Sequence, residues 1–303
     1  MSRLTRRSVL GAAAVIPLAP NLLRAEAPML GVSFAQHRRF LLGDFEVTTI
    51  LAGTTPREDP QSIFGTNVSA EEFAAVSDAN FLSTEVAQFY FTPTVVNTGA
   101  ELVLFDTGLS GPGTTAVLAA AGYAPEQFDK VVLTHMHGDH IGGLMSDGAP
   151  TFANATYVTG QTEFDFWAGA GNDGFEANVR PLADRFSFVG DDAAVTGGVT
   201  SVASHGHTPG HMAYRVDSGD AALLIMGDLA AHPIWSIANP DWELRFDMDK
   251  AAASATRRRM LDMAAVDRIP SVFYHVPFPA IGYVDTDGDG YRWIPETGQL
   301  MAG

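Results

Sequence analysis

The most constraining feature of this chain is a group of four potential metal ligands that follows a short apolar strand. Three histidines and one aspartate fall within the run His135-Met136-His137-Gly138-Asp139-His140. His135 and His137 are two positions apart, so in extended backbone both side chains point the same way. We expect Gly138 to let the backbone turn sharply, which would aim Asp139 and His140 at a second cation. Crowded imidazoles and a carboxylate would otherwise repel one another or stay unpaired, so the run predicts a metal site.

Composition limits what can hold that metal. The chain has 303 residues and no cysteine, which excludes disulfides, thiolate ligands and thiol nucleophiles. Any metal must therefore be bound by carboxylates and by some of the nine histidines. The formal net charge of −17 repels phosphate backbones and anionic lipid, which disfavours nucleic acid and membrane surfaces as partners. The one basic run, Arg257 to Arg259, is expected on a solvated helix face.

Residues 1–27 have the pattern of an export signal. Arg6 and Arg7 precede an apolar stretch from Val9 to Leu23, and the segment ends in the small-x-small pattern Ala25-Glu26-Ala27. The paired arginines resemble the twin-arginine export signal, which predicts a periplasmic or secreted protein. An ordinary secretory signal or a membrane anchor is the alternative. After removal of the signal we expect no membrane association.

Residues 28–303 are predicted to form a single α/β domain with mixed sheets and outer helices, because strands and helices alternate without a linker-like break. A helix is expected over Thr114–Ala121. A second is expected from Asp249, which can cap it, to Val266. The expected strands are Phe45–Leu51, Thr94–Val96, Glu101–Phe105, Lys130–Leu133, Thr151–Val158, Thr200–Ala203, Ala213–Val216, Ala221–Met226, Val272–Tyr274 and Ile281–Val284.

One further acidic stretch allows two interpretations. The segment from Asp285 to Glu296 fits the spacing of a calcium-binding loop. However, Pro295 lies within it, and strands rather than paired helices are expected on either side. A glycine-rich hairpin turn explains the same residues.

The run from His135 to His140 resembles the HxHxDH motif of the metallo-β-lactamase superfamily, which implies a four-layer αββα sandwich of two sheets flanked by helices. The resemblance covers roughly residues 40 to 295. Further landmarks follow in the family's order, namely Asp106-Thr107-Gly108, Gly206-His207-Thr208-Pro209-Gly210-His211, Gly227-Asp228 and His275. The resemblance implies a first metal bound by His135, His137 and His211, and a second metal bound by Asp139, His140 and His275. Asp228 would bridge the two metals.

The resemblance also implies that Asp106 orients the metal-binding loop. His207 is expected to support the ligands rather than bind metal, because outer partners commonly orient metal ligands. His232 would border the pocket. The candidates for its apolar walls are Trp167, Trp235, Phe164, Phe166 and Phe278, and packing in the core is the alternative for each of them.

The implied cofactors are two divalent metal ions, zinc foremost, with manganese, iron or cobalt as alternatives. A metal-bridging hydroxide would attack the substrate, with Asp139 passing a proton to the leaving group and Asp228 as the other catalytic carboxylate. The segments 40–47 and 275–279 favour the methyl parathion hydrolase-like and lactonase branch, in which homodimers are common. Its substrates are small, neutral and ester-like: lactones, aryl esters or organophosphate triesters. A glyoxalase II-like thioesterase, a one-metal sulfur dioxygenase and a non-enzymatic metal-binding protein are the alternatives.

Overall fold

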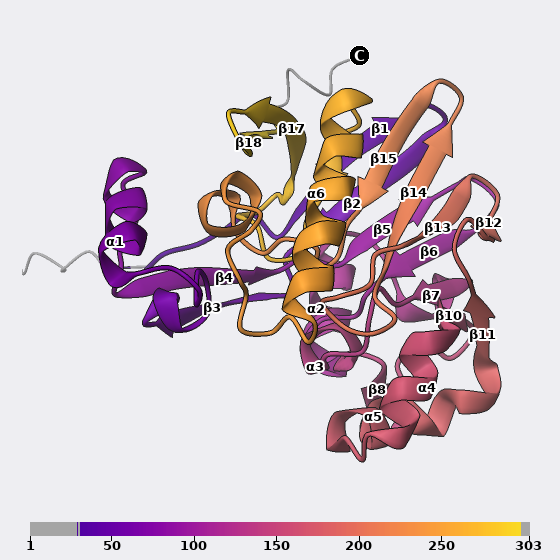
Figure 1. Cartoon of the computed structure of the whole chain (residues 1–303). Helices are drawn as coiled ribbons and strands as arrows, with labels where there is room; N and C mark the ends of the chain where they lie inside the picture. The colour runs from indigo at the N-terminus through magenta and orange to yellow at the C-terminus, as the bar shows by residue number, and fades with distance from the viewer. Residues whose placement is uncertain (1–28, 30, 298–303) are drawn as a thin grey trace, which may run out of the picture. The chain divides into compact units, whose positions relative to one another are not determined.

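Apolar side chains that alternate along short strands build two sheets, which pack face to face (Figure 1). The computed structural model describes residues 29 and 31–297, and residues 34–297 form the unit discussed here. The predicted export signal, residues 1–27, lies outside the described residues. No helix in the described part of the chain combines the length and the apolar character needed to cross a membrane.

Each large sheet has seven strands. In spatial order the first contains β1 (His37–Leu42), β2 (Phe45–Ile50), β5 (Thr94–Asn97), β6 (Leu102–Phe105), β7 (Lys130–Val132), β10 (Thr156–Gly160) and β11 (Phe186–Val189). The second contains β12 (Ala194–Thr196), β13 (Val199–Ala203), β14 (Met212–Ser218), β15 (Ala221–Ile225), β16 (Ser271–Val272), β17 (Ile281–Asp287) and β18 (Gly290–Pro295). Two small hairpins pair β3 (Gly53–Glu58) with β4 (Val86–Phe91), and β8 (Met145–Ser146) with β9 (Ala149–Pro150). The helices are α1 (Ala70–Ala79), α2 (Gly111–Ala120), α3 (Gly138–Ile141), α4 (Gln161–Gly169), α5 (Asp173–Asn178) and α6 (Lys250–Val266), with a π-helical turn at Pro233–Ala238.

The period-two pattern of the strands assigns side chains to separate layers. In β5 and β6, Val96 and Val103 face the core between the two sheets. Their neighbours Val95 and Leu104 face the opposite side, where the side chains of α2, α4 and α5 cover the first sheet. On the outer face of the second sheet, α6 packs against β14 and β15. This arrangement is the predicted αββα sandwich, which the structure confirms.

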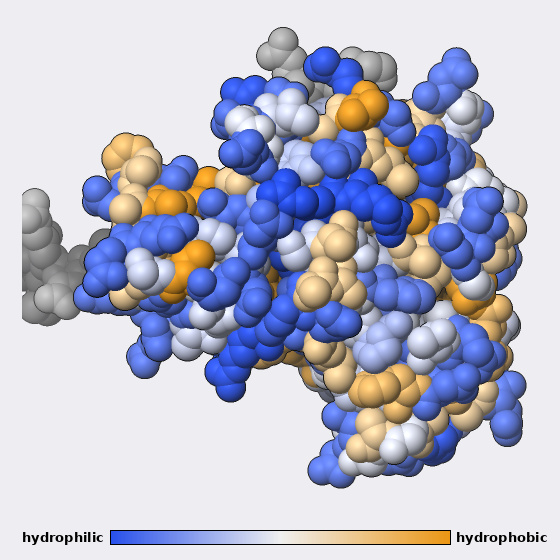
Figure 2. Space-filling view, in the orientation of Figure 1, coloured by the Kyte–Doolittle hydropathy of each residue, from blue (hydrophilic) through white to orange (hydrophobic). Residues whose placement is uncertain are grey.

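A small projection with its own apolar core lies beside the sandwich. The hairpin of β3 and β4 carries α1 and shares an aromatic core with residues 231–244. Phe73 of α1 stacks on Trp235 and on Trp242 within this core. On the face shown in Figure 2, hydrophilic side chains predominate, and apolar side chains gather on this projection.

Some element boundaries agree with the sequence prediction and others differ from it. Asp249 caps α6 by accepting a hydrogen bond from the backbone N–H of Ala252, as predicted. The helix expected from Thr114 begins earlier, at Gly111, because Ser110 supplies the cap. The strand expected over 151–158 starts only at Thr156. The acidic stretch from Asp285 forms the predicted hairpin, in which Asp287 pairs with Gly290.

Four strand ends bring the functional segments together. β6 runs parallel to β7, and β15 runs parallel to β16. Asp106 follows β6 and the 134–140 segment follows β7, while Asp228 and His275 follow β15 and β16. Side chains beyond the carboxyl ends of neighbouring parallel strands meet at one edge of a sheet, so the topology itself assembles the site.

Candidate metal centre

The loop after β7 is held in place by Asp106. The Asp106 carboxylate accepts hydrogen bonds from the backbone N–H of Thr134 and from its hydroxyl, both at 2.8 Å. It also accepts one from Nδ1 of His140 at 2.9 Å. Asp106 is buried and has a positive φ of 57°, a strained conformation that these bonds stabilise. The supporting role expected for Asp106 matches this geometry.

Gly138 contributes differently from the expectation. Its φ is not in the left-handed region, and a Cβ placed on it would meet no atom within 4 Å. The direction change at this point comes from the start of α3, with His137 as its N-cap residue. Gly138 instead leaves room in the pocket described below.

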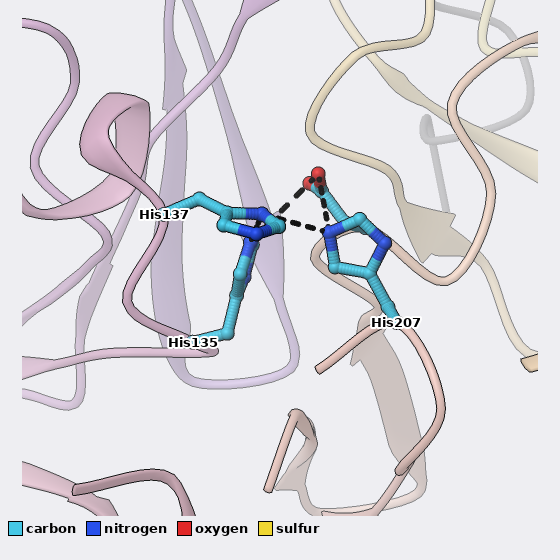
Figure 3. A group of neighbouring side chains, drawn as sticks. His135, His137 and His207 are labelled. Atoms are coloured by element: carbon cyan, nitrogen blue, oxygen red, sulfur yellow. Dashed lines mark hydrogen bonds and ion pairs between the residues drawn. The ribbon is translucent and has the colours of Figure 1, made fainter. Parts of the chain in front are cut away.

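A first group of ligand atoms comes from His135, His137, His207 and Asp228. One nitrogen or oxygen from each lies within 4.8 Å of all the others. Nδ1 of His137 lies 3.0 Å from Nε2 of His135 and 3.1 Å from Nε2 of His207. Figure 3 shows the three imidazoles converging on this point from two separate segments of the chain.

A second group, Asp139, His140 and His275, adjoins the first through Asp228. The ligand atoms of these three residues also lie within 4.8 Å of one another. Nε2 of His140 lies 3.1 Å from Oδ1 of Asp228, and Nε2 of His275 lies 3.1 Å from its Oδ2. Since Oδ2 also lies 3.3 Å from Nε2 of His207, the Asp228 carboxylate faces both groups.

Hydrogen bonds at Nδ1 fix the ring orientation of three of these histidines. Nδ1 of His207 lies 2.9 Å from the Asp247 carboxylate, and Nδ1 of His275 lies 2.8 Å from the carbonyl oxygen of Tyr90. Nδ1 of His140 donates to Asp106 as described above. When the ring is neutral and Nδ1 carries the proton, the lone pair on each Nε2 is directed into the cluster, as a metal ligand requires.

Two buried atoms without hydrogen-bond partners in the described part of the chain indicate whether the cluster fits a metal ion. Nε2 of His140 and Oδ1 of Asp228 are buried and have no hydrogen-bond partner among the described residues. They lie 3.1 Å apart. Buried polar atoms without a partner are costly, and a cation beside them would satisfy both. The donor set of imidazoles and carboxylates is also the one that suits zinc and similar divalent ions.

At three positions in the cluster, the pKa shift favours the protonation state that binds metal, which is neutral histidine or ionised aspartate. Burial lowers the pKa of His135 well below its ordinary value and lowers that of His137 to about 4, so both rings are neutral at neutral pH. Burial opposes ionisation of Asp228, but the neighbouring histidines, His275 foremost, hold its pKa well below the usual range. For His140, burial is outweighed by the carboxylates around it, which raise its pKa. Cation binding would displace the proton favoured there.

The position of His211 differs from the prediction made from the sequence. It was expected to be the third ligand of the first metal, but its Nε2 accepts a hydrogen bond from the backbone N–H of Asp228 at 3.1 Å. Its Nδ1 lies 3.2 Å from the carbonyl oxygen of Ser204. Both ring nitrogens are thus engaged, and His207, expected to be a supporting residue, occupies the position in the cluster. The two histidines are four residues apart in one loop, and only tertiary contacts distinguish them.

The pocket beside the cluster is lined by residues other than those expected. It has a volume of about 390 Å³ and reaches His137, Asp139, His207, Asp228 and His275. Its apolar walls are Ile63, Phe64, Phe89, Phe91, Leu109, Ala231, Leu244 and Phe246. These side chains come mainly from the β3–β4 projection and from residues 244–246.

The aromatic residues considered as wall candidates do not line the pocket. Trp167 donates its indole N–H to Glu163 and packs edge-on against His137 from outside the pocket. Trp235 is buried behind the wall and donates its indole N–H to Ser77. His232 stacks on Trp235 and accepts from two backbone N–H groups, with a pKa lowered to about 3 by burial. Phe164 and Phe166 pack against the core on the helical side of the first sheet. Phe278 does not line the pocket.

Two buried side chains that the sequence analysis missed secure the ligand loops. Glu163 accepts hydrogen bonds from the backbone N–H of Met136 and Gly210, from the Thr208 hydroxyl and from Trp167. It therefore ties the loop of His135 and His137 to the loop of His207. Burial raises its pKa, against the effect of these four bonds. A lone acidic residue on an amphipathic helix gives no sequence signal for such a role.

Arg257 is the second missed residue and a further correction. Within the basic run, Arg258 is partly exposed and Arg259 is exposed, as expected of a solvated face. Arg257 instead is only 1% exposed and forms an ion pair with Asp247 at 2.7 Å. The spacing of the α6 core stripe places it between Ala253 and Met260, which face inward.

Comparisons with known proteins place this geometry in a family. Residues 92–271, more than half of the chain, match the sequence profile described as "Metallo-beta-lactamase superfamily". An N-acyl homoserine lactonase from a Bacillus species is 25% identical over 158 residues, which cover 52% of this chain and 59% of the lactonase. The chain thus matches less than two thirds of the length of that relative.

Solved structures extend the similarity over the whole fold. A hydrolase named AbOPH, described as in the beta lactamase superfamily, superposes with a TM-score of 0.80 at 25% identity, covering 88% of this chain and 99% of that chain. AidC, described as a dizinc quorum-quenching lactonase in complex with a product, superposes with a TM-score of 0.79 at 23% identity. That match covers 86% of this chain and 97% of AidC.

Proposed function

Because the chain belongs to the metallo-beta-lactamase superfamily, we propose that it is a dinuclear metal-dependent hydrolase of lactones, aryl esters or organophosphate triesters. The observation that carries the proposal is the pair of adjacent ligand groups beside an apolar pocket, with the Asp228 carboxylate close to histidines of both groups. We propose His135, His137 and His207 for one cation, and Asp139, His140 and His275 for the other, with Asp228 between them. Zinc is the metal we favour.

When bound, a pair of divalent cations lowers the pKa of water, so that a nucleophile is available at neutral pH, and polarises the oxygen of the scissile bond. The protein's own residues do the rest. The histidines fix the site through their Nδ1 hydrogen bonds, and the phenyl rings of Phe64, Phe89 and Phe91 exclude water from one side of the substrate. Asp139 lines the pocket and is partly exposed, which supports a role for its carboxylate in passing a proton to a leaving group.

The pocket chemistry supports a neutral, largely apolar substrate. Eight apolar side chains form its walls, and Arg57 also lines it. A carbonyl or phosphoryl oxygen can accept a hydrogen bond from a guanidinium, while the apolar part of an ester fits against the phenyl rings. The lactonase named among the relatives supports a lactone as the first substrate to test.

A substrate panel tests the proposal. Purified protein of known metal content is given lactones, aryl esters, phosphotriesters and thioesters, with the variants His137→Ala and Asp228→Ala beside it. We expect both variants to lose bound metal and hydrolysis together. His205→Ala is the matched control, because His205 is exposed and lies outside the cluster. Full activity in either cluster variant, or turnover of thioesters alone, would contradict the proposed reaction.

We also propose export by the twin-arginine route, on the sequence of residues 1–27 alone. Fusing this segment to a folded reporter tests it. We expect export of the fusion and its retention in the cytoplasm when Arg6 and Arg7 are both replaced by lysine. Export through the general secretory route would contradict the proposal.

A further inference from the structure

Arg257 places a buried positive charge behind the candidate metal centre. Its side chain lies on α6, is 1% exposed and uses three different nitrogens for hydrogen bonds. One of them, Nη2, donates to Oδ2 of Asp247 at 2.7 Å. A buried charge is tolerated only with such satisfaction, so the guanidinium has a defined position rather than a flexible one.

Asp247 connects this guanidinium to the cluster. Its Oδ1 lies 2.9 Å from Nδ1 of His207, while Oδ2 is bound to Arg257. The carboxylate thus holds the ring of His207 from behind and leaves Nε2 directed toward His137 and Asp228. Outer partners of this kind set the orientation and the basicity of a metal-binding imidazole.

The remaining donors of Arg257 fix the segment that follows Asp228. Nε donates to the carbonyl oxygen of Leu229 at 2.7 Å, and Nη1 donates to that of Pro240 at 2.9 Å. Leu229 is the residue after Asp228, and this segment continues to the pocket wall at Leu244 and Phe246. One side chain therefore restrains a histidine and the carboxylate between the two metal groups.

We propose that Arg257 is a positioning residue of the metal centre, which acts through Asp247 on His207 and through the Leu229 carbonyl on Asp228. The inference rests on the proposed metal centre and goes beyond it, since it requires no particular substrate. It also explains why arginine is needed. A lysine has a single nitrogen and cannot reach the carboxylate and the separate carbonyls together.

Metal affinity measured without substrate tests this role. The dissociation constants of Zn²⁺ are measured by chelator competition for the full-length wild type and for Arg257→Met, Arg257→Lys and Asp247→Asn. We expect affinity for one Zn²⁺ to fall about 10- to 100-fold in Arg257→Met and in Asp247→Asn, with Arg257→Lys between them and the wild type. Arg259→Met on the exposed face of α6 is the control and should stay within about twofold of wild type.

Cobalt substitution and metal-free unfolding separate positioning from packing. A positioning role predicts that the visible absorption spectrum of the Co²⁺ form changes in Arg257→Met. Unchanged Zn²⁺ affinity and an unchanged cobalt spectrum in folded Arg257→Met would overturn the inference, even if the metal-free protein unfolds more easily. If Arg257→Met does not fold, the Zn²⁺ affinity and the cobalt spectrum of Arg257→Lys and Asp247→Asn test the inference in its place. A wild type that binds metal but hydrolyses none of the panel would refute the proposed function alone.

Discussion

At the scale of single residues, the choice between His207 and His211 decides how the first metal is held. Nε2 of His207 faces the cluster, whereas Nε2 of His211 accepts the backbone N–H of Asp228. In the proposed centre, one ring would therefore bind the cation and the other would support the loop that carries Asp228. The sequence places both in one motif, and the difference arises from Asp247 behind one ring and Ser204 behind the other.

The two histidines should fail differently when removed. His207→Ala should lose one of two bound metals, because it deletes a ligand. His211→Ala should keep both metals but lose about 1–3 kcal/mol of stability in the metal-free protein, because a buried backbone N–H is left unpaired. Metal content by mass spectrometry and denaturant unfolding measure the two effects. The reverse pattern would restore His211 as the ligand.

Two glycines near the ligands give a second prediction at this scale. A Cβ on Gly210 would lie 2.1 Å from the backbone nitrogen of Glu163, whereas one on Gly138 meets nothing within 4 Å. Gly210→Ala should therefore cost about 1–3 kcal/mol through overpacking. Gly138→Ala should remain within about 1 kcal/mol of wild type. Equal unfolding midpoints in a urea titration would contradict the assigned packing.

At the scale of elements, α4 joins the two ligand-bearing loops through one carboxylate. Glu163 accepts four hydrogen bonds, of which two come from backbone N–H groups of those loops. Replacing Glu163 by leucine keeps a side chain of similar volume but leaves these hydrogen-bond donors unpaired. We expect a loss of about 3 kcal/mol or more. Glu176→Leu on α5, which removes an exposed carboxylate, is the control, and a similar loss in both variants would refute the specific role.

The β3–β4 projection and the 244–246 segment line the pocket, so we expect them to determine which substrates fit. Phe246 lines the pocket and is 43% exposed, so its removal leaves the core intact. Phe246→Ala should lower kcat/KM for the most apolar ester about tenfold, since the lost contact is worth about 1.4 kcal/mol, and should spare small esters. Phe188→Ala, also partly exposed but outside the pocket, should change neither. An equal decrease for all ester lengths would argue against a selectivity role.

At the scale of the whole molecule, the sequence predicted the layers better than the pocket. Strand alternation such as Val95 against Val96 and the caps at Asp249 are local signals, so the sandwich and α6 could be read from them. The dense run at 135–140 likewise identified the metal segment. The pocket walls could not be found in this way, because Phe89 and Phe246 lie far apart in the sequence and meet only when the projection folds against the sandwich.

The role of the buried charge of Arg257 could not be predicted from the sequence either. Arg257 looked like its neighbours in a basic run, and nothing local distinguishes it from Arg258. Its role depends on the closeness of Asp247 and of three carbonyl groups from a different segment. Such partners follow from tertiary structure, which composition and spacing do not encode.

The proposed site holds two cations with Asp228 between them, and a metal titration counts them. Metal-free protein is titrated with Zn²⁺ while bound metal and lactone or ester hydrolysis are followed together. We predict saturation at two equivalents, with hydrolysis dependent on the second, and loss of both equivalents in Asp228→Ala. Saturation at one equivalent, or full hydrolysis by the metal-free protein, would contradict the dinuclear site.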